Sequence, residues 1–236
     1  MIFYAGLIFF QVGRYNLKME LKLGGGRALV VVAHPDDETI WMGGTILANP
    51  QVKWAVFSLC RSDDKDRAPK FKRVCRFLGA RAVISDLDDE EQLSLRESLP
   101  EIRRRIRREL GNPSTLLGIS ARHLKKIIEA PRFDFVFAHG YNGEYGHPRH
   151  RGVSRVVKDL VGRGKIETKQ LLTFSYQLDE KKNICRPKEA DVFLKLSPAA
   201  FKEKKKIINE LYGFKKSTFE YRTLSGVENF KLFKLR

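Results

Sequence analysis

The feature that most constrains the fold of this chain is a short apolar run that ends abruptly in charged residues. Residues 28–33 read ALVVVA, and His34 and Pro35 follow directly. A continuous apolar run of this length, rich in β-branched residues, is typical of a strand that is buried on both faces of a parallel sheet. Pro35 ends the strand because proline has no backbone N–H to donate to a sheet. The chain therefore has to cover both faces of that sheet.

Apolar runs and helical patterns alternate along the rest of the chain. Further strands are predicted at residues 52–59, 82–85, 133–138, 171–176 and 191–196. Helices are predicted at residues 39–48, 99–110, 122–130, 152–160 and 198–212, with one more that ends near residue 79 and an acidic loop at residues 86–92. This alternation predicts an α/β fold, in which helices pack on both faces of a mostly parallel sheet. No internal repeat or domain boundary interrupts the pattern.

The N-terminus is an apolar segment whose role the sequence leaves open. Residues 1–12 read MIFYAGLIFFQV, which is shorter than the ~20 residues needed to span a bilayer. No basic residue precedes it, so it is a poor match to a signal peptide. It is interpreted as an extra strand or packing arm, as an extension upstream of a true start at Met19, or as a short anchor at a membrane surface. We expect an N-terminal extension at residues 1–26 and a single domain at residues 27–236.

The chain carries a large excess of positive charge. It has 45 Lys and Arg against 28 Asp and Glu, which gives a formal net charge of +17. Such an excess attracts phosphates, nucleic acids and anionic membranes. Two predicted helices hold basic clusters, made of Arg103, Arg104, Arg105, Arg107 and Arg108, and of Lys202, Lys204, Lys205 and Lys206. These clusters are interpreted as solvated helix faces, as a docking surface for a phosphate-bearing or lipid-linked sugar, or as a nucleic-acid-binding surface.

The cysteines indicate the cellular compartment, and the absence of certain motifs limits the kinds of partner that the protein is expected to bind. Cys60, Cys75 and Cys185 are odd in number and widely spaced, which does not fit a disulfide framework. Free thiols favour a reducing compartment, so we expect a cytoplasmic protein. Nucleic acid is not expected as a partner, because the sequence contains no zinc-finger or RRM signature. Peripheral contact with a membrane surface and assembly into a homo-oligomer both remain open.

Two polar clusters follow predicted strands. Residues 34–38 read HPDDE directly after the strand at 28–33, and residues 139–150 read HGYNGEYGHPRH after the strand at 133–138. In open α/β sheets, functional sites form at the carboxyl ends of the strands. We therefore expect these two loops, although distant in sequence, to meet at one edge of the sheet.

The two clusters contain the residue types of a catalytic metal site. His34 and Asp37 come from the first loop, and His147 and His150 come from the second. Two histidines and one carboxylate, with a fourth position left to water, are typical of catalytic zinc. Zinc lowers the pKa of its bound water to about 7, and a neighbouring carboxylate such as Asp36 can take the proton. Alone, each cluster has a plainer interpretation, as a helix cap or an incidental His-x-x-His pair, but together they favour a metal site.

These residues lie in two motifs of a known family. Residues 30–46, VVVAHPDDETIWMGGTI, closely resemble the A-H-P-D-D-E signature of the LmbE-like, or PIG-L, N-deacetylases. Residues 142–153, NGEYGHPRHRGV, resemble the second motif of that family, G-x-Y-G-H-P-D-H. With weaker similarities elsewhere, the resemblance covers roughly residues 27–217. It implies a Rossmann-like fold, a Zn²⁺ cofactor, and cleavage of amide-linked acetyl groups from substrates that contain N-acetylglucosamine.

The resemblance also implies roles for individual residues. The metal ligands would be His34, Asp37 and His150. The catalytic residues would be Asp36 as general base, His147 as proton donor or oxyanion partner, and Tyr145 at the oxyanion. Glu38 would either hydrogen-bond to the residues that form the site or stabilise the start of the helix that follows. Arg61 is interpreted either as a substrate-binding residue or as an ordinary surface charge.

One position departs from the family pattern. Where the family commonly has Asp between the two histidines of the second motif, this chain has Arg149. An aspartate there could accept a hydrogen bond from His147 and raise its basicity, which an arginine cannot do. We therefore expect His147 to be less basic than its counterparts. Either Glu144 replaces the lost partner, or His147 acts mainly as a hydrogen-bond donor.

The function that the sequence predicts is zinc-dependent hydrolysis of an amide. An acetyl group would be removed from an N-acetylated sugar, carried on a small molecule or a glycoconjugate. Two alternatives stay open. One is an enzyme that deacylates a non-sugar amine or a thiol-conjugated glycoside. The other is a non-enzymatic, basic binding protein that keeps a degenerate site.

Overall fold

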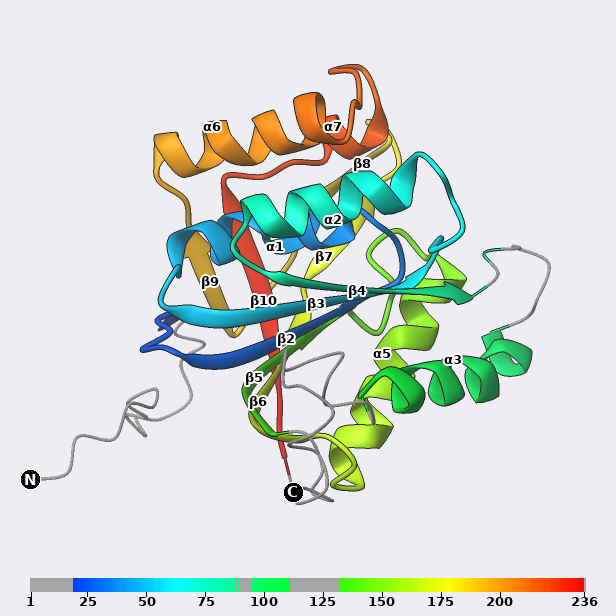
Figure 1. Cartoon of the computed structure of the whole chain (residues 1–236). Helices are drawn as coiled ribbons and strands as arrows, with labels where there is room; N and C mark the ends of the chain where they lie inside the picture. The colour runs from blue at the N-terminus through cyan, green and yellow to red at the C-terminus, as the bar shows by residue number, and fades with distance from the viewer. Residues whose placement is uncertain (1–18, 88, 90–94, 111–131, 236) are drawn as a thin grey trace, which may run out of the picture.

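The chain is built on a twisted eight-stranded sheet (Figure 1). The computed structural model describes residues 19–87, 89, 95–110 and 132–235. Its strand order is β1-β9-β10-β6-β5-β2-β3-β4. The strands are β1 (Met19–Glu20), β2 (Gly26–Val32), β3 (Val52–Cys60), β4 (Arg81–Leu87), β5 (Arg132–Ala138), β6 (Glu167–Phe174), β9 (Val192–Lys195) and β10 (Val227–Phe233). A separate antiparallel pair is formed by β7 (Tyr176–Asp179) and β8 (Ile184–Pro187).

Five adjacent strands, β6-β5-β2-β3-β4, run parallel, and β10 is antiparallel to both of its neighbours. The helices are α1 (Asp37–Ala48), α2 (Arg67–Phe77), α3 (Leu95–Leu110), α5 (Pro148–Gly162), α6 (Pro198–Lys206) and α7 (Phe219–Arg222), with one π-helical stretch, η2 (Ile207–Leu211). Figure 1 shows α1, α2 and α6 over one face of the sheet and α3 and α5 over the other. The predicted α/β fold, with a mostly parallel sheet covered on both faces, is confirmed.

Strand β2 shows why both faces need cover. Its side chains alternate between two separate cores. Val30 and Val32 pack in the core beneath α1 and α2, whereas Leu29 and Val31 pack in the core beneath α3 and α5. All four side chains are fully buried. The unbroken apolar run in the sequence is therefore the sum of two strand faces, each with a period of two residues.

The structure also contains elements that the sequence pattern did not predict. These are the β7-β8 pair, β10 and α7. The helix predicted at residues 198–212 changes at Ile207 from α-helix to the π-helical turn η2. Helix α5 begins four residues earlier than predicted, because His147 caps it and Pro148 occupies its first turn. The helix predicted at residues 122–130 lies outside the described residues.

The N-terminal expectation is only partly within the described chain. Residues 1–18 lie outside it, while Met19 and Glu20 form β1, which pairs in parallel with β9 at the edge of the sheet. None of the helices in the described chain combines the length and the hydrophobicity needed to cross a bilayer. The role of residues 1–26 stays a prediction.

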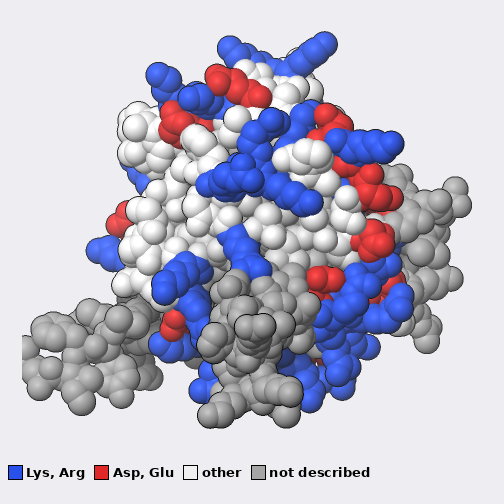
Figure 2. Space-filling view, viewed as in Figure 1, with Lys and Arg blue, Asp and Glu red and all other residues white. Residues whose placement is uncertain are grey.

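The basic residues are spread rather than gathered in one patch on the face that Figure 2 shows. Lys and Arg side chains lie there in several groups, and acidic side chains lie among them. On α3, four arginines pair with acidic neighbours: Arg103 with Asp159, Arg104 and Arg105 with Glu101, and Arg108 with Glu109. This arrangement fits the interpretation of α3 as a solvated helix face whose charges are largely paired.

One lysine of the second basic cluster is not solvated. Lys204 on α6 is fully buried, and its Nζ lies 2.6 Å from Oε1 of Glu228 on β10, which is also fully buried. Glu228 further accepts hydrogen bonds from the backbone N–H groups of Gly44 and Thr45 on α1. The pair therefore joins two helices to the sheet.

Replacement of Lys204 by Met should destabilise the protein by about 3 kcal/mol, because it leaves the Glu228 carboxylate buried without its counter-charge. Denaturant unfolding of the variant and the wild type measures this difference. Lys202→Met, at an exposed position of the same helix, is the matched control and should change the unfolding free energy by less than about 0.5 kcal/mol. Equal stability of the two variants would contradict the structural role of the pair.

Candidate metal and catalytic site

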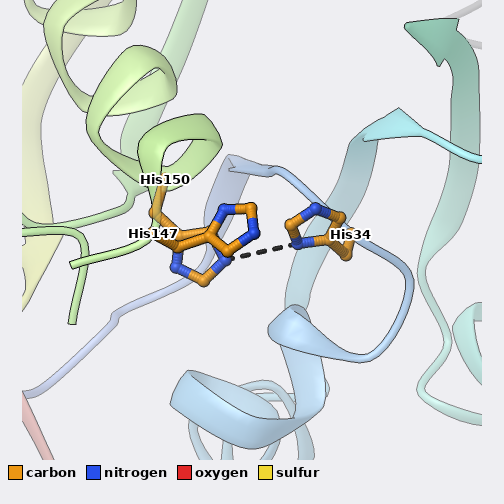
Figure 3. Close-up of side chains that lie close together, drawn as sticks. All are labelled: His34, His147 and His150. Atoms are coloured by element: carbon orange, nitrogen blue, oxygen red, sulfur yellow. Dashed lines mark hydrogen bonds between the residues drawn. The ribbon is translucent and has the colours of Figure 1, made fainter. Parts of the chain in front are cut away.

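The site lies where β2 and β5 end. These strands are adjacent and parallel, with Val31 paired to Ala138, so their carboxyl ends lie at the same edge of the sheet. The loop after β2 carries His34, and the loop after β5 leads to His147 and His150 at the start of α5. Figure 3 shows the three imidazoles turned toward one another from these two segments. The predicted meeting of the two loops is thus present in the fold.

Three side-chain atoms come together at the spacing of metal ligands. Nδ1 of His34 lies 3.4 Å from Oδ2 of Asp37 and 3.3 Å from Nε2 of His150. The third side of this triangle, from His150 Nε2 to Asp37 Oδ2, is 3.3 Å. Zinc bonds of about 2.0–2.1 Å in a tetrahedral site place ligand atoms about 3.3–3.5 Å apart. The donor set and its spacing therefore fit a divalent metal ion such as zinc.

Carboxylates orient both histidines of this triangle. Nε2 of His34 lies 2.7 Å from Oδ1 of Asp89, and Nδ1 of His150 lies 2.7 Å from Oε2 of Glu144. When each imidazole is neutral and donates to its carboxylate from that nitrogen, the opposite nitrogen has a free lone pair directed into the triangle. Carboxylates behind histidine ligands are a common feature of metal sites, because they set the tautomer and the ring orientation.

A fourth histidine supports the arrangement from the interior. His139 is fully buried and stacks on His150 with ring centroids 3.8 Å apart. The backbone N–H of Ala33 donates to its Nε2 at 3.0 Å, so its proton is on Nδ1, which lies 2.8 Å from Glu144. Glu144 therefore accepts from both histidines at once. The alternative in which Glu144 partners His147 is wrong, because the histidines that Glu144 contacts are His139 and His150.

The Asp36 carboxylate lies beside this triangle under backbone strain. Asp36 has a φ of 112°, in the left-handed region that is costly for residues other than glycine. Its Oδ2 pairs with Nη1 of Arg67 at 2.5 Å, and its backbone N–H donates to Glu38. Burial and the adjacent Asp37 charge raise the pKa of Asp36 well above its usual range, and Arg67 opposes them. Such strain is typical of functional positions.

Asp37 titrates in the opposite direction. Burial acts to raise its pKa, but the nearby His150 and His139 hold the pKa of this carboxyl well below its usual range. Asp37 is thus the ionised member of the pair, as a metal ligand has to be. Two adjacent buried carboxylates repel each other, and a divalent cation would allow both to ionise.

His147 presents one nitrogen to the site. Its Nδ1 accepts from the backbone N–H of Arg149 at 3.2 Å, so in the neutral ring the proton is on Nε2. Its pKa is lowered to about 3, first by burial and then by the neighbouring His150 and His34. The low basicity agrees with the expected direction, but its causes are burial and the other histidines. His147 is therefore placed as a neutral hydrogen-bond donor.

These groups border one cavity of about 250 Å³. His34, Asp36, Asp37, Tyr145 and His147 line it, and burial raises the pKa of Tyr145, so this phenol keeps its proton and can donate. His150 and Glu38 are completely buried behind the lining residues. The structure therefore brings the predicted metal and catalytic side chains to one place.

Arg61 also borders the cavity, and its observed partner is Asp89. Its Nε and Nη2 lie 3.2 and 2.8 Å from Oδ2 of Asp89. Burial opposes ionisation of Asp89, but His34 and Arg61 together hold the pKa of this carboxyl at about 2. Arg61 is thus linked through Asp89 to a candidate metal ligand, and contact with substrate stays a proposal.

Three contributors were not identified from the sequence. Asp89 and His139 each lie just beyond a strand, β4 and β5, so the rule that sites form at strand ends could have identified them. Arg67 is the third, and no local pattern distinguishes it from other surface arginines. Its contact with Asp36 depends on how α2 packs beside the loop after β2.

The sequence of the chain matches a known protein family. The sequence model of the family PIG-L, described as GlcNAc-PI de-N-acetylase, matches residues 29–161. N-acetylglucosaminyl-phosphatidylinositol de-N-acetylase of Bos taurus is 26% identical over 153 residues, which cover 61% of this chain and 53% of that protein. The chain spans about half the length of the curated relatives that it matches.

Solved structures share the fold at low sequence identity. N,N'-diacetylchitobiose deacetylase from Pyrococcus horikoshii superposes with a TM-score of 0.58 at 15% identity, covering 88% of this chain and 83% of that one. GalB, the 4-carboxy-2-hydroxymuconate hydratase of Pseudomonas putida KT2440, superposes with a TM-score of 0.57 at 16% identity, covering 89% and 97%. Proteins of this fold therefore differ in the reaction that they catalyse.

The fold and the site together define a Rossmann-like α/β protein with a potential His/Asp metal-binding group at the carboxyl end of its sheet. The chain belongs to the PIG-L family, since the family's model matches more than half of it. The resemblance to LmbE-like, PIG-L N-deacetylases that the two motifs predicted is confirmed.

Glu144→Gln should weaken zinc binding about 10- to 100-fold, because the amide is a poorer acceptor for the two imidazole N–H groups that it orients. Titration of metal-free protein with zinc, competed by a chromophoric chelator, measures the affinity. Glu210→Gln, on the exposed surface of η2, is the control and should bind zinc like the wild type. An unchanged affinity in Glu144→Gln would show that the hydrogen bonds to Glu144 are not needed for the site.

Proposed function

We propose that this chain is a metal-dependent hydrolase that removes the acetyl group from an N-acetylglucosamine-type substrate with a metal-activated water. The observation that carries the proposal is the triangle of His34 Nδ1, Asp37 Oδ2 and His150 Nε2, with sides of 3.3–3.4 Å. It opens toward a cavity that Asp36 also lines. Family membership supports the choice of reaction, and the deacetylase from Pyrococcus horikoshii supports a sugar substrate.

His34, Asp37 and His150 would hold the ion, for which zinc is the best match to the donor set. When bound there, zinc would supply Lewis acidity to the acetyl carbonyl and would make the attacking water more acidic. Asp36 then accepts the proton of the attacking water through Oδ1, since Oδ2 is engaged by Arg67. The carbonyl carbon is attacked, and its oxygen becomes negatively charged.

The remaining groups act on that oxygen and on the leaving nitrogen. Tyr145, which keeps its phenolic proton, is placed to donate to the oxyanion. His147 is neutral and carries its proton on Nε2, so it donates a hydrogen bond to the oxyanion or to the leaving group and keeps that proton. The proton that Asp36 has accepted can return to the nitrogen, so free amine and acetate leave. The second alternative, a binding protein with a degenerate site, is disfavoured because this set of groups is complete.

The decisive experiment measures acetate release together with metal content. Purified protein should contain close to one zinc per chain. It should release acetate from at least one of N-acetylglucosamine, diacetylchitobiose, and nucleotide-linked or inositol-linked N-acetylglucosamine. Treatment with a chelator should abolish the activity, and zinc should restore it. Protein that holds no metal and releases no acetate from these substrates would overturn the proposal.

Asp36→Asn should lower kcat by about 10²–10⁴-fold, because the amide cannot take the proton of the attacking water. Zinc content should stay near that of the wild type, since Asp36 is not one of the three ligands. Asp63→Asn, at an exposed position after β3, is the matched control and should keep full activity. If Asp36→Asn loses zinc in proportion to activity, Asp36 is a ligand rather than the base.

A further inference from the structure

Helix α7 contributes a wall of the cavity that lies outside the segment matched by the family. Among the described residues that line the cavity, Phe219 and Glu220 lie outside residues 29–161. The groups assigned to metal binding and catalysis all lie within that segment. The chemistry and this wall therefore come from different parts of the chain.

The wall is built into the fold by contacts on both sides of α7. Before it, the hydroxyl of Tyr212 donates to Oε1 of Glu38 at 2.8 Å, and the Phe214 ring lies beneath the Arg67 guanidinium at 4.4 Å. After it, the hydroxyl of Thr223 accepts from the backbone N–H of Cys185 at 3.1 Å. These contacts place α7 against the loop after β2, so the position of Phe219 is set by the same residues that hold Asp36.

Among the described residues that line the cavity, Phe219 is an aromatic side chain with no hydrogen bond and no catalytic assignment, although part of it packs against the core beneath α1 and α2. Trp41 is fully buried, and its Nε1 donates to Asp37. Tyr145 is assigned to the oxyanion. Phe219 is partly exposed, carries no polar atom, and packs edge-to-face on Tyr145 with ring centroids 5.2 Å apart. It thus offers an apolar surface in a cavity whose other walls include charged groups.

We infer that Phe219 is a specificity-determining residue that binds the sugar of the substrate, by contact between its ring and the C–H face of the pyranose. This inference rests on the proposed function. It adds a residue that recognises the sugar attached to the amide nitrogen. A pyranose has hydroxyl groups around its edge and C–H groups on its faces. A cavity that combines an aromatic ring with the carboxylate of Asp89 and the guanidinium of Arg61 matches both.

Phe219→Leu keeps an apolar side chain of similar bulk but removes the aromatic face. It should raise the KM for the N-acetylglucosamine substrate by about fivefold or more, with kcat within about twofold of the wild type. The inhibition constant of glucosamine, the amine product, should rise by the same factor, while that of acetate should stay unchanged. Phe219→Tyr should behave like the wild type. Phe77→Leu, at an exposed phenylalanine of α2, is the matched control.

The outcomes separate this inference from the proposed function. Sugar deacetylation with an unchanged KM and glucosamine inhibition constant in Phe219→Leu overturns the inference and leaves the proposed function in place. A fall in kcat at constant KM also overturns it, because Phe219 would then act only by supporting Tyr145. A wild-type protein that binds zinc but releases acetate from no sugar overturns the proposed substrate class and this inference together.

Discussion

The site depends on the buried carboxylate of Asp37. Its Oδ2 lies within 3.4 Å of ring nitrogens of His34, His139 and His150 and accepts the backbone N–H of His34. A carboxylate that is 3% exposed is costly unless cations or donors surround it. The backbone N–H of His34 and the indole N–H of Trp41 donate to this carboxylate, and a divalent ion in the triangle would supply the positive charge. The loop after β2 and the start of α5 are therefore held together by the groups that would bind metal.

Several side chains of the site are held in place by partner residues. Asp89 after β4 orients His34, Glu144 before α5 orients His150, and Arg67 on α2 holds Asp36. Preorganisation of this kind reduces the reorganisation that the reaction would otherwise require. The C-terminal elements contribute in the same way, because Tyr212 bonds Glu38 directly behind Asp36. The groups that orient the candidate site therefore come from several elements along the carboxyl edge of the sheet.

The central part of the fold could be predicted because its pattern is local. The run at residues 28–33 is apolar on both strand faces, and the β2 side chains do divide between two cores. The C-terminal third was harder to predict. Strand β10 alternates less clearly, and α7 is only four residues long, so neither has a strong periodic signal. Lys204 lies in a run of lysines, and only the packing of α6 on α1 and β10 makes it a buried ion-pair partner.

The sequence by itself determined the parallel core and identified the residues of the candidate site, because His34, Asp36, Asp37 and His150 lie in contiguous motifs at predicted strand ends. Only the tertiary structure decided which other residues hydrogen-bond to these side chains and orient them. Asp89, Arg67 and Tyr212 come from segments distant in sequence, and their contacts depend on the order of strands in the sheet and on helix packing, which no local pattern encodes. The local sequence does not show whether an arginine or a glutamate is buried or solvated. Only the packing of the folded chain distinguishes the two cases.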